Sequence, residues 1–536
     1  MPLSSISLLP PLLIIIIACI TQSVHKALFS GIIFAAIIAN NGDISEAFSA
    51  IFNRALAHLT NFDNITLYLF LLIISSLIAM FSQSGTILHA TNIVAKKMKT
   101  KRAVEFSSIT SSFILSIDDY LSILTAGFIM RPLADKFEIC RTRLAYFVHS
   151  LSGPLVVLSP FSSWAATILI QFDNNGVRLE NTPSTTIISD PFTLYVQVIP
   201  YIFYSILTVF SVIFLASTQF HPYRRSALFT NENSEPHHEI KKTTFKKNST
   251  QPLALYNILI PIITLLGTII VGFLYSGNYW LLGGTRGFMQ AIQANDNTFL
   301  IMCIGSLSSF FAAFIILALQ KTISFYQLPA IVWDGWRLIY GAITMVILAS
   351  LFGTFIKNDL MTGTYIAQTL LSSVSLVFIP VIIFITSLII TLATGSAWGT
   401  FTLMIPIVIQ MIISLQSIIT PSPAHAILLL IPSLGATFSG SVCGDNISLF
   451  SETTAMTASA VGITPFQHFY SQLFYVYPVI IATLMAYLLS GLALYIPIFS
   501  NVFVLFLLSI FLVILIFNLQ KVLENKLKNK MRTSNE

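Results

Sequence analysis

The chain has 536 residues, of which 55% are hydrophobic and only 9% are charged, and its mean hydropathy is +0.84. Soluble globular domains carry about 25% charged residues, so this composition excludes that class and indicates an all-α polytopic membrane protein. The net charge of +6 gathers in Lys/Arg clusters beside apolar runs. These clusters predict orientation in a membrane, with the basic segments in the cytoplasm, and do not indicate nucleic-acid binding.

Apolar runs of membrane-spanning length recur from one end of the chain to the other. The first run, 8–20, follows no basic residue and no cleavage site precedes His25, so we expect a retained helix. We predict about 11–14 hydrophobic spans in two structurally related halves, with broken helices and re-entrant hairpins. The predicted units are a transmembrane half at 1–220, a cytoplasmic basic linker at 221–252, a second transmembrane half at 253–520 and a basic cytoplasmic tail at 521–536.

The segment 104–130 has basic clusters on both sides, and the positive-inside rule assigns both clusters to the cytoplasm. Its length is too short for two full crossings at about 20 residues each, but it suits two half-crossings. We therefore predict a re-entrant hairpin whose tip runs from Ser116 to Tyr120. A single long tilted helix is the alternative.

Two helices in different halves are interrupted by Gly, Pro and Ser. The first break precedes Ser162-Ser163-Trp164, and the second lies in Thr394-Gly395-Ser396-Ala397-Trp398. Paired interruptions of this kind are typical of the binding sites of secondary transporters, where broken helices expose backbone groups to the substrate.

Carboxylates interrupt two strongly apolar runs, at Asp118-Asp119 and at Gly444-Asp445. An ionised carboxylate in the membrane costs several kcal/mol or more unless it is paired, hydrated or bound to a cation. Oxygen ligands suit Na⁺, and a buried carboxylate can exchange its cation for a proton. Asp118, Asp119 and Asp445 are therefore candidate Na⁺ ligands. The alternative is structural pairing with Arg131 or Lys136, or capping of half-helices.

Several neighbouring residues complete the candidate ion or substrate site. Hydroxyl groups of Ser163, Thr394, Ser396 and Ser448 lie close in sequence to the acids or the breaks. Glu452 is either a second proton carrier or a charge at a helix N-terminus. His149 and His468 are candidate proton-relay residues, with a structural hydrogen bond as the alternative. Trp333, Trp336 and Arg337 are predicted to anchor a helix at the membrane interface.

Several motifs together resemble the NhaC family of Na⁺/H⁺ antiporters, within the ion-transporter superfamily. The matching segments are Pro10–Leu13 with Ser23–Leu28, Ile117–Lys136 with Arg143–Tyr146, Ser162–Trp164, Ala393–Phe401, Gly444–Thr454, and His468 with Gln472-Leu473. The resemblance implies a secondary transporter with discontinuous helices that exchanges Na⁺ for protons. Malate/lactate-type exchangers also belong to the family.

The chain departs from the family pattern at four positions. Asn446 stands in place of His, Glu452 in place of Asp, Leu449 in place of Pro, and His149 in place of Asp. Three of these changes alter ionisable positions near the expected site, so ion stoichiometry or substrate can differ. Asn446 is retained as a candidate binding residue.

These observations predict a Na⁺/H⁺ antiporter that works by alternating access in the cytoplasmic membrane. The alternative is a Na⁺- or H⁺-coupled transporter of a small organic acid or amino acid. We expect no enzymatic activity, because no nucleophile–base pair or metal-ligand cluster has the required spacing. We expect no cofactor beyond transported Na⁺ and H⁺. The expected partners are membrane lipid and a small cation or carboxylate, and a homodimer is left open.

Overall fold

The structure of the chain is a computed structural model. It describes residues 5–21, 23–86, 99–116, 118–178, 187–222, 254–293, 297–362, 364–366, 374–419, 423–449 and 451–535. Most of the predicted linker 221–252 lies outside these residues, so its position stays a prediction.

The described chain is almost entirely helical, and the all-α polytopic architecture is confirmed. In the first part of the chain the helices are α1 (Leu9–Thr21), α2 (Val24–Ala39), α3 (Ile44–Thr60), α4 (Phe62–Gln83), α6 (Lys101–Ile114), α7 (Asp119–Lys136), α8 (Arg141–Leu158), α9 (Ser163–Asn174), α10 (Pro191–Val198) and α11 (Phe203–Thr218). Two short parallel strands, β1 (Val177–Arg178) and β2 (Ile187–Ile188), follow α9.

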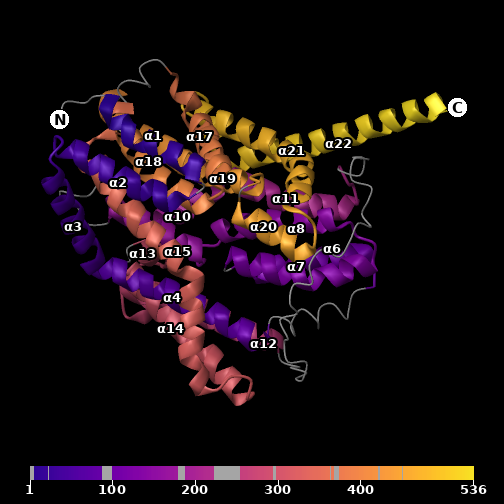
Figure 1. Ribbon diagram of the computed structural model, residues 1–536, viewed down its shortest axis with the longest axis horizontal. Helices are drawn as coiled ribbons and strands as arrows, with labels where there is room; N and C mark the ends of the chain where they lie inside the picture. Colours follow the sequence, from indigo (N-terminus) through magenta and orange to yellow (C-terminus); the bar gives the residue numbers. More distant parts are fainter. Residues whose placement is uncertain are drawn as a thin grey trace.

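The second part of the chain has longer helices. They are α12 (Ala254–Ser276), α13 (Phe288–Gln293), α14 (Thr298–Leu319), α15 (Leu328–Thr354), α17 (Ile379–Thr394), α18 (Ala397–Ile419), α19 (Pro423–Asn446), α20 (Glu452–Val461), α21 (Pro465–Leu492) and α22 (Val502–Asn535). Helix α22 continues through the predicted basic tail and projects beyond the helical body (Figure 1).

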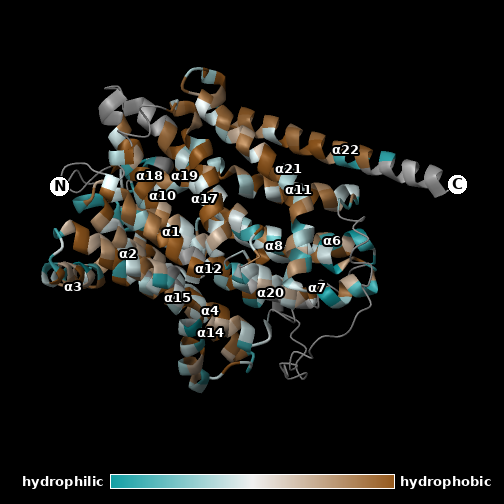
Figure 2. Ribbon diagram, turned by 45° about the horizontal axis from the view of Figure 1, so that its top comes forward, coloured by the Kyte–Doolittle hydropathy of each residue, from teal (hydrophilic) through white to brown (hydrophobic). Residues whose placement is uncertain are grey.

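Within the described residues, eight helices are long and apolar enough to cross a membrane. Two bent pairs raise this number to as many as ten, namely α8 with α9 at 42° and the segment 191–201 with α11 at 50°. Apolar residues dominate α1, α17, α21 and α22, whereas polar residues gather on α3, α6 and α7 (Figure 2). The protein is therefore a multi-pass membrane protein.

Helices from the two predicted halves pack together. Helix α4 contacts α14 and α15, α7 contacts α20, and α8 contacts α21. Figure 1 shows the same mixing, since the indigo α4 lies among the orange-pink α14 and α15. Any site built from both halves can therefore form inside this single helical body.

The predicted hairpin at 104–130 is confirmed as two packed helices with a break between them. Helix α6 ends at Ile114, helix α7 begins at Asp119, and the two contact each other. At 1.5 Å per residue they are about 21 and 27 Å long, shorter than the hydrocarbon core of about 30 Å. The alternative of one long tilted helix is wrong, because the chain turns at the predicted tip.

Close packing of α19 on α17 depends on two glycines one helical turn apart. A Cβ on Gly440 would lie 2.5 Å from the Phe384 carbonyl oxygen, and one on Gly444 would lie 2.5 Å from the Thr391 Cβ. This spacing is the small-xxx-small pattern of membrane helix pairs, in which missing side chains let backbones approach. It fixes the position of Asp445, the next residue of α19.

Helix α3 is amphipathic, and no described spanning segment includes it. His58 near its end is partly buried, with its Nε2 2.8 Å from the Tyr68 hydroxyl and its Nδ1 accepting from the Asn64 amide at 3.0 Å. Burial lowers the pKa of the His58 imidazole from 6.5 to about 4. The neutral ring is therefore the form that the folded protein holds.

This pKa predicts a loss of stability in acid. Between pH 6.5 and 4, His58 binds a proton in the unfolded chain but stays neutral in the folded protein. The free energy of unfolding therefore falls as the pH falls through this window. We expect a contribution of roughly 1–3 kcal/mol, reduced from the full shift by solvent contact. Unfolding of the detergent-solubilised protein, measured across this range, should be less pH-dependent for His58→Gln. If the free energy of unfolding had the same pH dependence in the natural protein and in His58→Gln, the assignment of this effect to His58 would be wrong.

Candidate functional site

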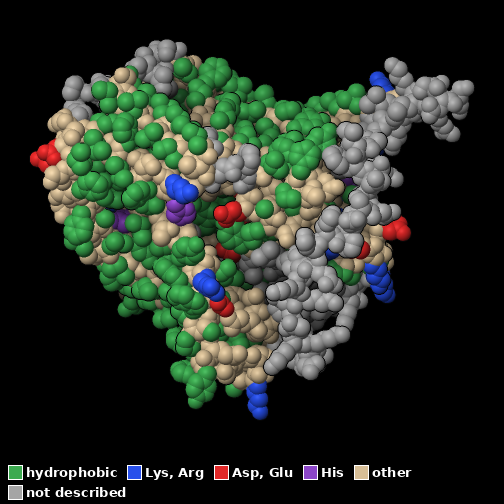
Figure 3. Space-filling view, in the orientation of Figure 1, with side chains coloured by type: hydrophobic (Ala, Val, Ile, Leu, Met, Phe, Trp, Pro, Cys, Tyr) green, Lys and Arg blue, Asp and Glu red, His purple; other side chains and the backbone are tan. Residues whose placement is uncertain are grey.

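A cavity of about 780 Å³ lies between helices of both halves and collects most of the predicted acids. Its walls include Asp118, Asp119, Asp445, Glu452 and Ser396. Figure 3 shows acidic side chains in a recess near the centre of the face seen there. The recess is the place where the two polar interruptions of the sequence, far apart along the chain, come together.

Four helices begin at this cavity, and each begins at a break in the chain. Wall residues come from the first turn of α7, α9, α18 and α20, represented by Asp119, Trp164, Trp398 and Glu452. The N-terminal end of a helix carries partial positive charge, which favours nearby carboxylates. The breaks thus stabilise the acids electrostatically as well as exposing them.

The two Ser-x-Trp motifs have the same local structure. Ser162 Oγ accepts from the Ala165 amide and Ser396 Oγ accepts from the Gly399 amide, both at 3.1 Å. Each serine therefore caps the helix that follows it. Gly395, with a φ of 67°, ends α17 in the left-handed conformation that favours glycine.

The two tryptophans of these motifs meet at the cavity. The rings of Trp164 and Trp398 contact edge to face, with centroids 5.5 Å apart. The Trp164 indole also donates to Asp119 Oδ1 at 3.3 Å. The motif shared by the two halves therefore positions one of the predicted ion ligands.

Asp119 and Asp445 are both almost completely buried, with 1% and 5% of their surface exposed. Asp445 accepts from Ser451 Oγ at 2.6 Å and from Thr453 Oγ1 at 2.7 Å. Asp118 Oδ2 accepts from Ser163 Oγ at 3.3 Å. Arg131 instead packs against Gly462, and the Lys136 ammonium lies 5.6 Å from the Phe137 ring centre.

Among the described residues, no Lys or Arg side chain lies within 4.0 Å of the Asp119, Asp445 or Glu452 carboxylates. Glu452 is exposed in the first turn of α20 and accepts from the Tyr120 hydroxyl at 3.1 Å. It is thus both a helix N-terminal charge and a cavity residue. Asp119, Asp445 and Glu452 therefore have no fixed Lys or Arg partner in the described part of the chain.

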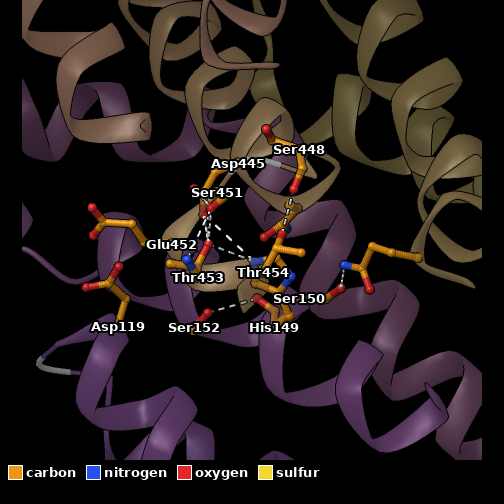
Figure 4. Close-up of polar contacts among 12 residues, drawn as sticks. Asp119, His149, Ser150, Ser152, Asp445, Ser448, Ser451, Glu452, Thr453 and Thr454 are labelled. Atoms are coloured by element: carbon orange, nitrogen blue, oxygen red, sulfur yellow. Dashed lines mark hydrogen bonds and ion pairs between the residues drawn. The ribbon is translucent and has the colours of Figure 1, made fainter. Parts of the chain in front are cut away.

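His149 and His468 extend from Asp445 into the protein as a continuous hydrogen-bond chain. His149 Nε2 lies 3.0 Å from Thr453 Oγ1 and 3.8 Å from Asp445 Oδ2, and His149 Nδ1 lies 2.8 Å from His468 Nε2. Figure 4 shows Asp445, Thr453 and His149 of this hydrogen-bond chain, with Asp119 and Glu452 to one side of them. Both histidines are fully buried.

The donors of this hydrogen-bond chain determine the tautomers of His149 and His468. Since Thr453 donates its hydroxyl proton to Asp445, His149 donates from Nε2 and accepts at Nδ1 from the His468 Nε2–H. His468 Nδ1 is then an acceptor, and it is buried with no hydrogen-bond partner in the described part of the chain. The hydrogen-bond chain therefore ends at His468 Nδ1, a nitrogen that can accept a proton.

Several predicted site residues lie behind the cavity wall. Asn446 donates to the Tyr204 hydroxyl at 3.1 Å, and Ser448 Oγ donates to the Leu392 carbonyl at 3.1 Å. Thr394 Oγ1 accepts from the Ser396 amide at 3.3 Å. These contacts hold the ends of α17 and α19, and a binding role for these three residues stays a prediction.

The sequence reasoning missed His25, Asp334 and Arg337 as cavity residues. His25 Nε2 lies 2.9 Å from the Gly341 carbonyl, and Asp334 accepts from Gln83 Nε2 at 2.6 Å. Trp333 and Trp336 line a separate apolar hollow on the surface, whereas Arg337 lines the acidic cavity. The sequence offered one indication that Asp334 and Arg337 act together. They are three residues apart and are therefore neighbours on one face of a helix.

Comparison with known proteins decides the family. The sequence profile of the Na⁺/H⁺ antiporter family matches residues 155–492, more than half of the chain. The chain belongs to the Na⁺/H⁺ antiporter family. This agrees with the resemblance read from its motifs and makes the protein a membrane transporter rather than an enzyme. The matched region contains α9, α18, α20 and Asp445, and it begins after the Asp118-Asp119 hairpin.

Individual proteins resemble this antiporter-family chain in sequence or in structure. An uncharacterized protein of Haemophilus influenzae is 27% identical over 494 residues, covering 90% of each chain. The Alcanivorax borkumensis YdaH transporter has a similar structure, with a TM-score of 0.52, 14% identity, and coverage of 84% of this chain and 89% of that one. Neisseria gonorrhoeae MtrF has a TM-score of 0.44, 12% identity and 84% coverage of both chains.

Proposed function

We propose that this antiporter-family protein exchanges Na⁺ for protons across the cytoplasmic membrane by alternating access. One observation supports the proposal above the rest. Asp119 and Asp445 are buried at a cavity between broken helices without Lys or Arg partners among the described residues. A bound cation or a bound proton stabilises such carboxylates, and exchange between the two is antiport.

In the proposed cycle, Na⁺ binds to carboxylate oxygens of Asp118, Asp119 and Asp445, with water completing its shell. Among the described residues, no three acidic, His or Cys side chains form a closed metal cluster. A transported ion has to leave as readily as it enters, so its ligands need not form such a cluster before the ion binds. Protonation of the same carboxylates then releases Na⁺.

The experiment is Na⁺-dependent proton movement in proteoliposomes that contain only this protein. An inward Na⁺ gradient should drive protons outward, as reported by a pH-sensitive dye inside the vesicles, and protein-free vesicles are the control. Replacement of Na⁺ by Li⁺ or K⁺ measures selectivity. Vesicles with folded protein that show no Na⁺-driven pH change would overturn the proposal.

The proton is proposed to travel between Asp445 and His468 through Thr453 and His149. All three hydrogen bonds are 3.0 Å or shorter, and the terminal His468 Nδ1 is a buried acceptor. His468 lies one turn into α21, whose capping Thr464 follows the segment that Arg141 contacts. The His468 end of this hydrogen-bond chain is predicted to face the cytoplasm, since Arg141 belongs to a basic cluster.

His149→Gln is expected to slow Na⁺-driven proton movement by on the order of tenfold or more, because positioned proton donors and acceptors typically contribute at least this much. The rate should be measured against external pH. His221→Gln is the matched control, since His221 contacts Tyr475 outside this chain of bonds. Equal rates and pH profiles for the two variants would assign His149 a structural role only.

A further inference from the structure

The motif Ser23–Leu28 has no role in the proposed ion site, and it lies where α2 begins. Helices α1 and α2 pack against each other as a hairpin (Figure 1). They have 13 and 16 residues, so at 1.5 Å per residue they are about 20 and 24 Å long, shorter than the hydrocarbon core of about 30 Å. Two short packed helices of this kind indicate a re-entrant hairpin, which enters and leaves the membrane on the same side.

Both ends of this hairpin lie at the outer side of the membrane. Helix α4 is long enough to cross and ends at Gln83, before a basic cluster that the positive-inside rule assigns to the cytoplasm, so α4 begins on the outer side. Helix α3 joins α2 to α4, and its Arg54 pairs with Asp359, beyond the end of α15, at 2.6 Å. At the other end of the hairpin, the Ser7 carbonyl accepts from the Thr362 hydroxyl at 2.9 Å.

The turn of the hairpin lies at the central cavity. His25 lines the cavity, and its Nε2 lies 2.9 Å from the Gly341 carbonyl and 3.0 Å from Thr344 Oγ1. The Thr344 hydroxyl donates to carbonyls of its own helix, so His25 Nε2 is the donor to both groups. From Gly341 to the end of α15 at Thr354 the distance along the helix is about 20 Å. Since α2 also contacts the segment Phe355–Asp359, the hairpin lies between the cavity and the outer surface along this side of α15.

The helix against which the hairpin lies is held by other helices. A Cβ on Gly335 would lie 2.5 Å from Ser76 Oγ, so α15 lies directly against α4. Closer to its outer end, Ser350 Oγ of α15 accepts from the Gln171 amide at 3.1 Å and from the Asn174 amide at 3.0 Å. Both donors belong to α9. Helix α15 is therefore part of a fixed frame with α4 and α9.

The hairpin is attached to this frame mainly by apolar contacts. Among the described residues of 5–39, only His25 and the Ser7 carbonyl form hydrogen bonds that involve a side chain and join this segment to the rest of the protein. Ile14 and Leu28 are buried in apolar packing. Apolar contacts are non-directional, so they re-form after a small rotation, whereas a hydrogen bond needs its partner in place. The hairpin is thus anchored at its outer ends and held at its turn by one side chain.

We propose that the α1–α2 hairpin is the outer gate of the cavity and that His25 is its latch. While His25 Nε2 is bonded to α15 the gate is closed, and release of these bonds opens the cavity to the outer side. The inference deepens the proposed alternating access and rests on it, because a cavity that opens to each side in turn needs a movable barrier on the outer side.

The first test measures access to the cavity from the outer side. Met345, a cavity residue next to Thr344, is replaced by Cys in a protein whose four natural cysteines are changed to Ala. Right-side-out membrane vesicles are treated with a membrane-impermeant thiol reagent, and the rate of labelling is measured. His25→Leu should raise this rate about fivefold or more, the usual effect of one lost hydrogen bond on a two-state equilibrium.

Ser30→Ala is the matched control for this labelling. It removes a hydrogen bond of α2 that stays within the helix, from the Ser30 hydroxyl to the Lys26 carbonyl, and it leaves the latch in place. The labelling rate of Met345→Cys should be unchanged by it. Equal rates for His25→Leu and Ser30→Ala would overturn the proposal.

The second test locks the latch reversibly. In the double variant His25→Cys with Thr344→Cys, a short bifunctional thiol reagent with a cleavable disulfide bridges the two positions. Bridging should stop Na⁺-driven proton movement, because a cavity held closed on one side delivers no ions there. Cleavage of the bridge should restore the rate of the same protein before bridging, which also demonstrates that the variant is folded. A bridged protein that exchanges as fast as the cleaved one would overturn the proposal.

A disulfide within the hairpin is the control for this lock. A Cβ on Gly31 would lie 2.3 Å from Ile14 Cγ1, so Ile14→Cys with Gly31→Cys places two thiols close enough to join α1 to α2. The hairpin then moves as one unit, and exchange should continue at the rate of the reduced protein. Loss of exchange on forming this disulfide would contradict movement of the hairpin as a unit and so overturn the gate.

The two readouts separate the gate from Na⁺/H⁺ exchange. Labelling needs no Na⁺ gradient, so faster labelling after His25→Leu in a protein that moves no protons supports the gate and removes only the exchange proposal. Na⁺-driven proton movement that continues in the bridged protein supports exchange and removes only the gate.

Discussion

Asp119→Asn and Asp445→Asn are each expected to abolish Na⁺-driven proton movement, with a fall in rate on the order of 100-fold or more. The amide keeps the size of the side chain but removes the charge that attracts Na⁺ and the oxygen that accepts the proton. Loss of groups that only support metal ligands already costs roughly 10–100-fold in affinity, so loss of a ligand should cost at least as much. The measurement is the dye response of proteoliposomes during an imposed Na⁺ gradient.

The matched control is Asp173→Asn. Asp173 is also a buried aspartate, but it pairs with Arg178 at 3.0 Å and does not line the cavity. This variant should exchange at nearly the natural rate once the amount of folded protein is equalised. If Asp119→Asn and Asp445→Asn exchanged as fast as Asp173→Asn, the site would be wrongly assigned.

Arg143→Met is expected to lower the free energy of unfolding by about 3–5 kcal/mol, the usual effect of leaving a buried charge without its partner. Arg143 and Glu105 are 2% and 1% exposed, and they form two parallel bonds of 2.8 and 3.2 Å. Arg143 also donates to the Leu215 and Phe220 carbonyls. The pair therefore joins α6 and α8 to the end of α11.

Removing both charges should restore much of this loss. In the double variant Glu105→Leu with Arg143→Met, no buried charge is left without a partner, although the carbonyls lose their donor. Arg141→Met is the control, because the side chains of its pair with Asp135 are 38% and 42% exposed and such pairs contribute about 0–1 kcal/mol. Thermal unfolding in detergent compares the variants, and a small loss for Arg143→Met alone would contradict this interpretation.

Much of the fold follows from the sequence because its signals are local. Hydropathy over about 20 residues predicts which segments enter the membrane. Ser162 and Ser396 mark helix starts because a serine side chain can cap the backbone three residues later. The break at Asp118-Asp119 was predictable because basic clusters on both sides of a short apolar run require the chain to turn back.

The same local signals did not place Arg337 at the cavity. Its neighbours Trp333 and Trp336 indicate an interface anchor, which stays a prediction, and the side chain also lines the acidic cavity. Which face of α15 meets the cavity depends on the contact of Gly335 with Ser76, residues more than 250 positions apart. A hydropathy pattern gives the period of a helix but not the partner against which each face packs.

The sequence alone therefore determined the membrane class, the breaks and the acids at those breaks, since each depends on residues adjacent in the chain. The tertiary structure decided that Asp119 and Asp445 share one cavity, that His149 joins Asp445 to His468, and that Arg337 lies among the same wall residues. These juxtapositions depend on how closely α17, α19, α4 and α15 approach one another. That approach is set by side-chain packing between distant segments, which no local pattern records.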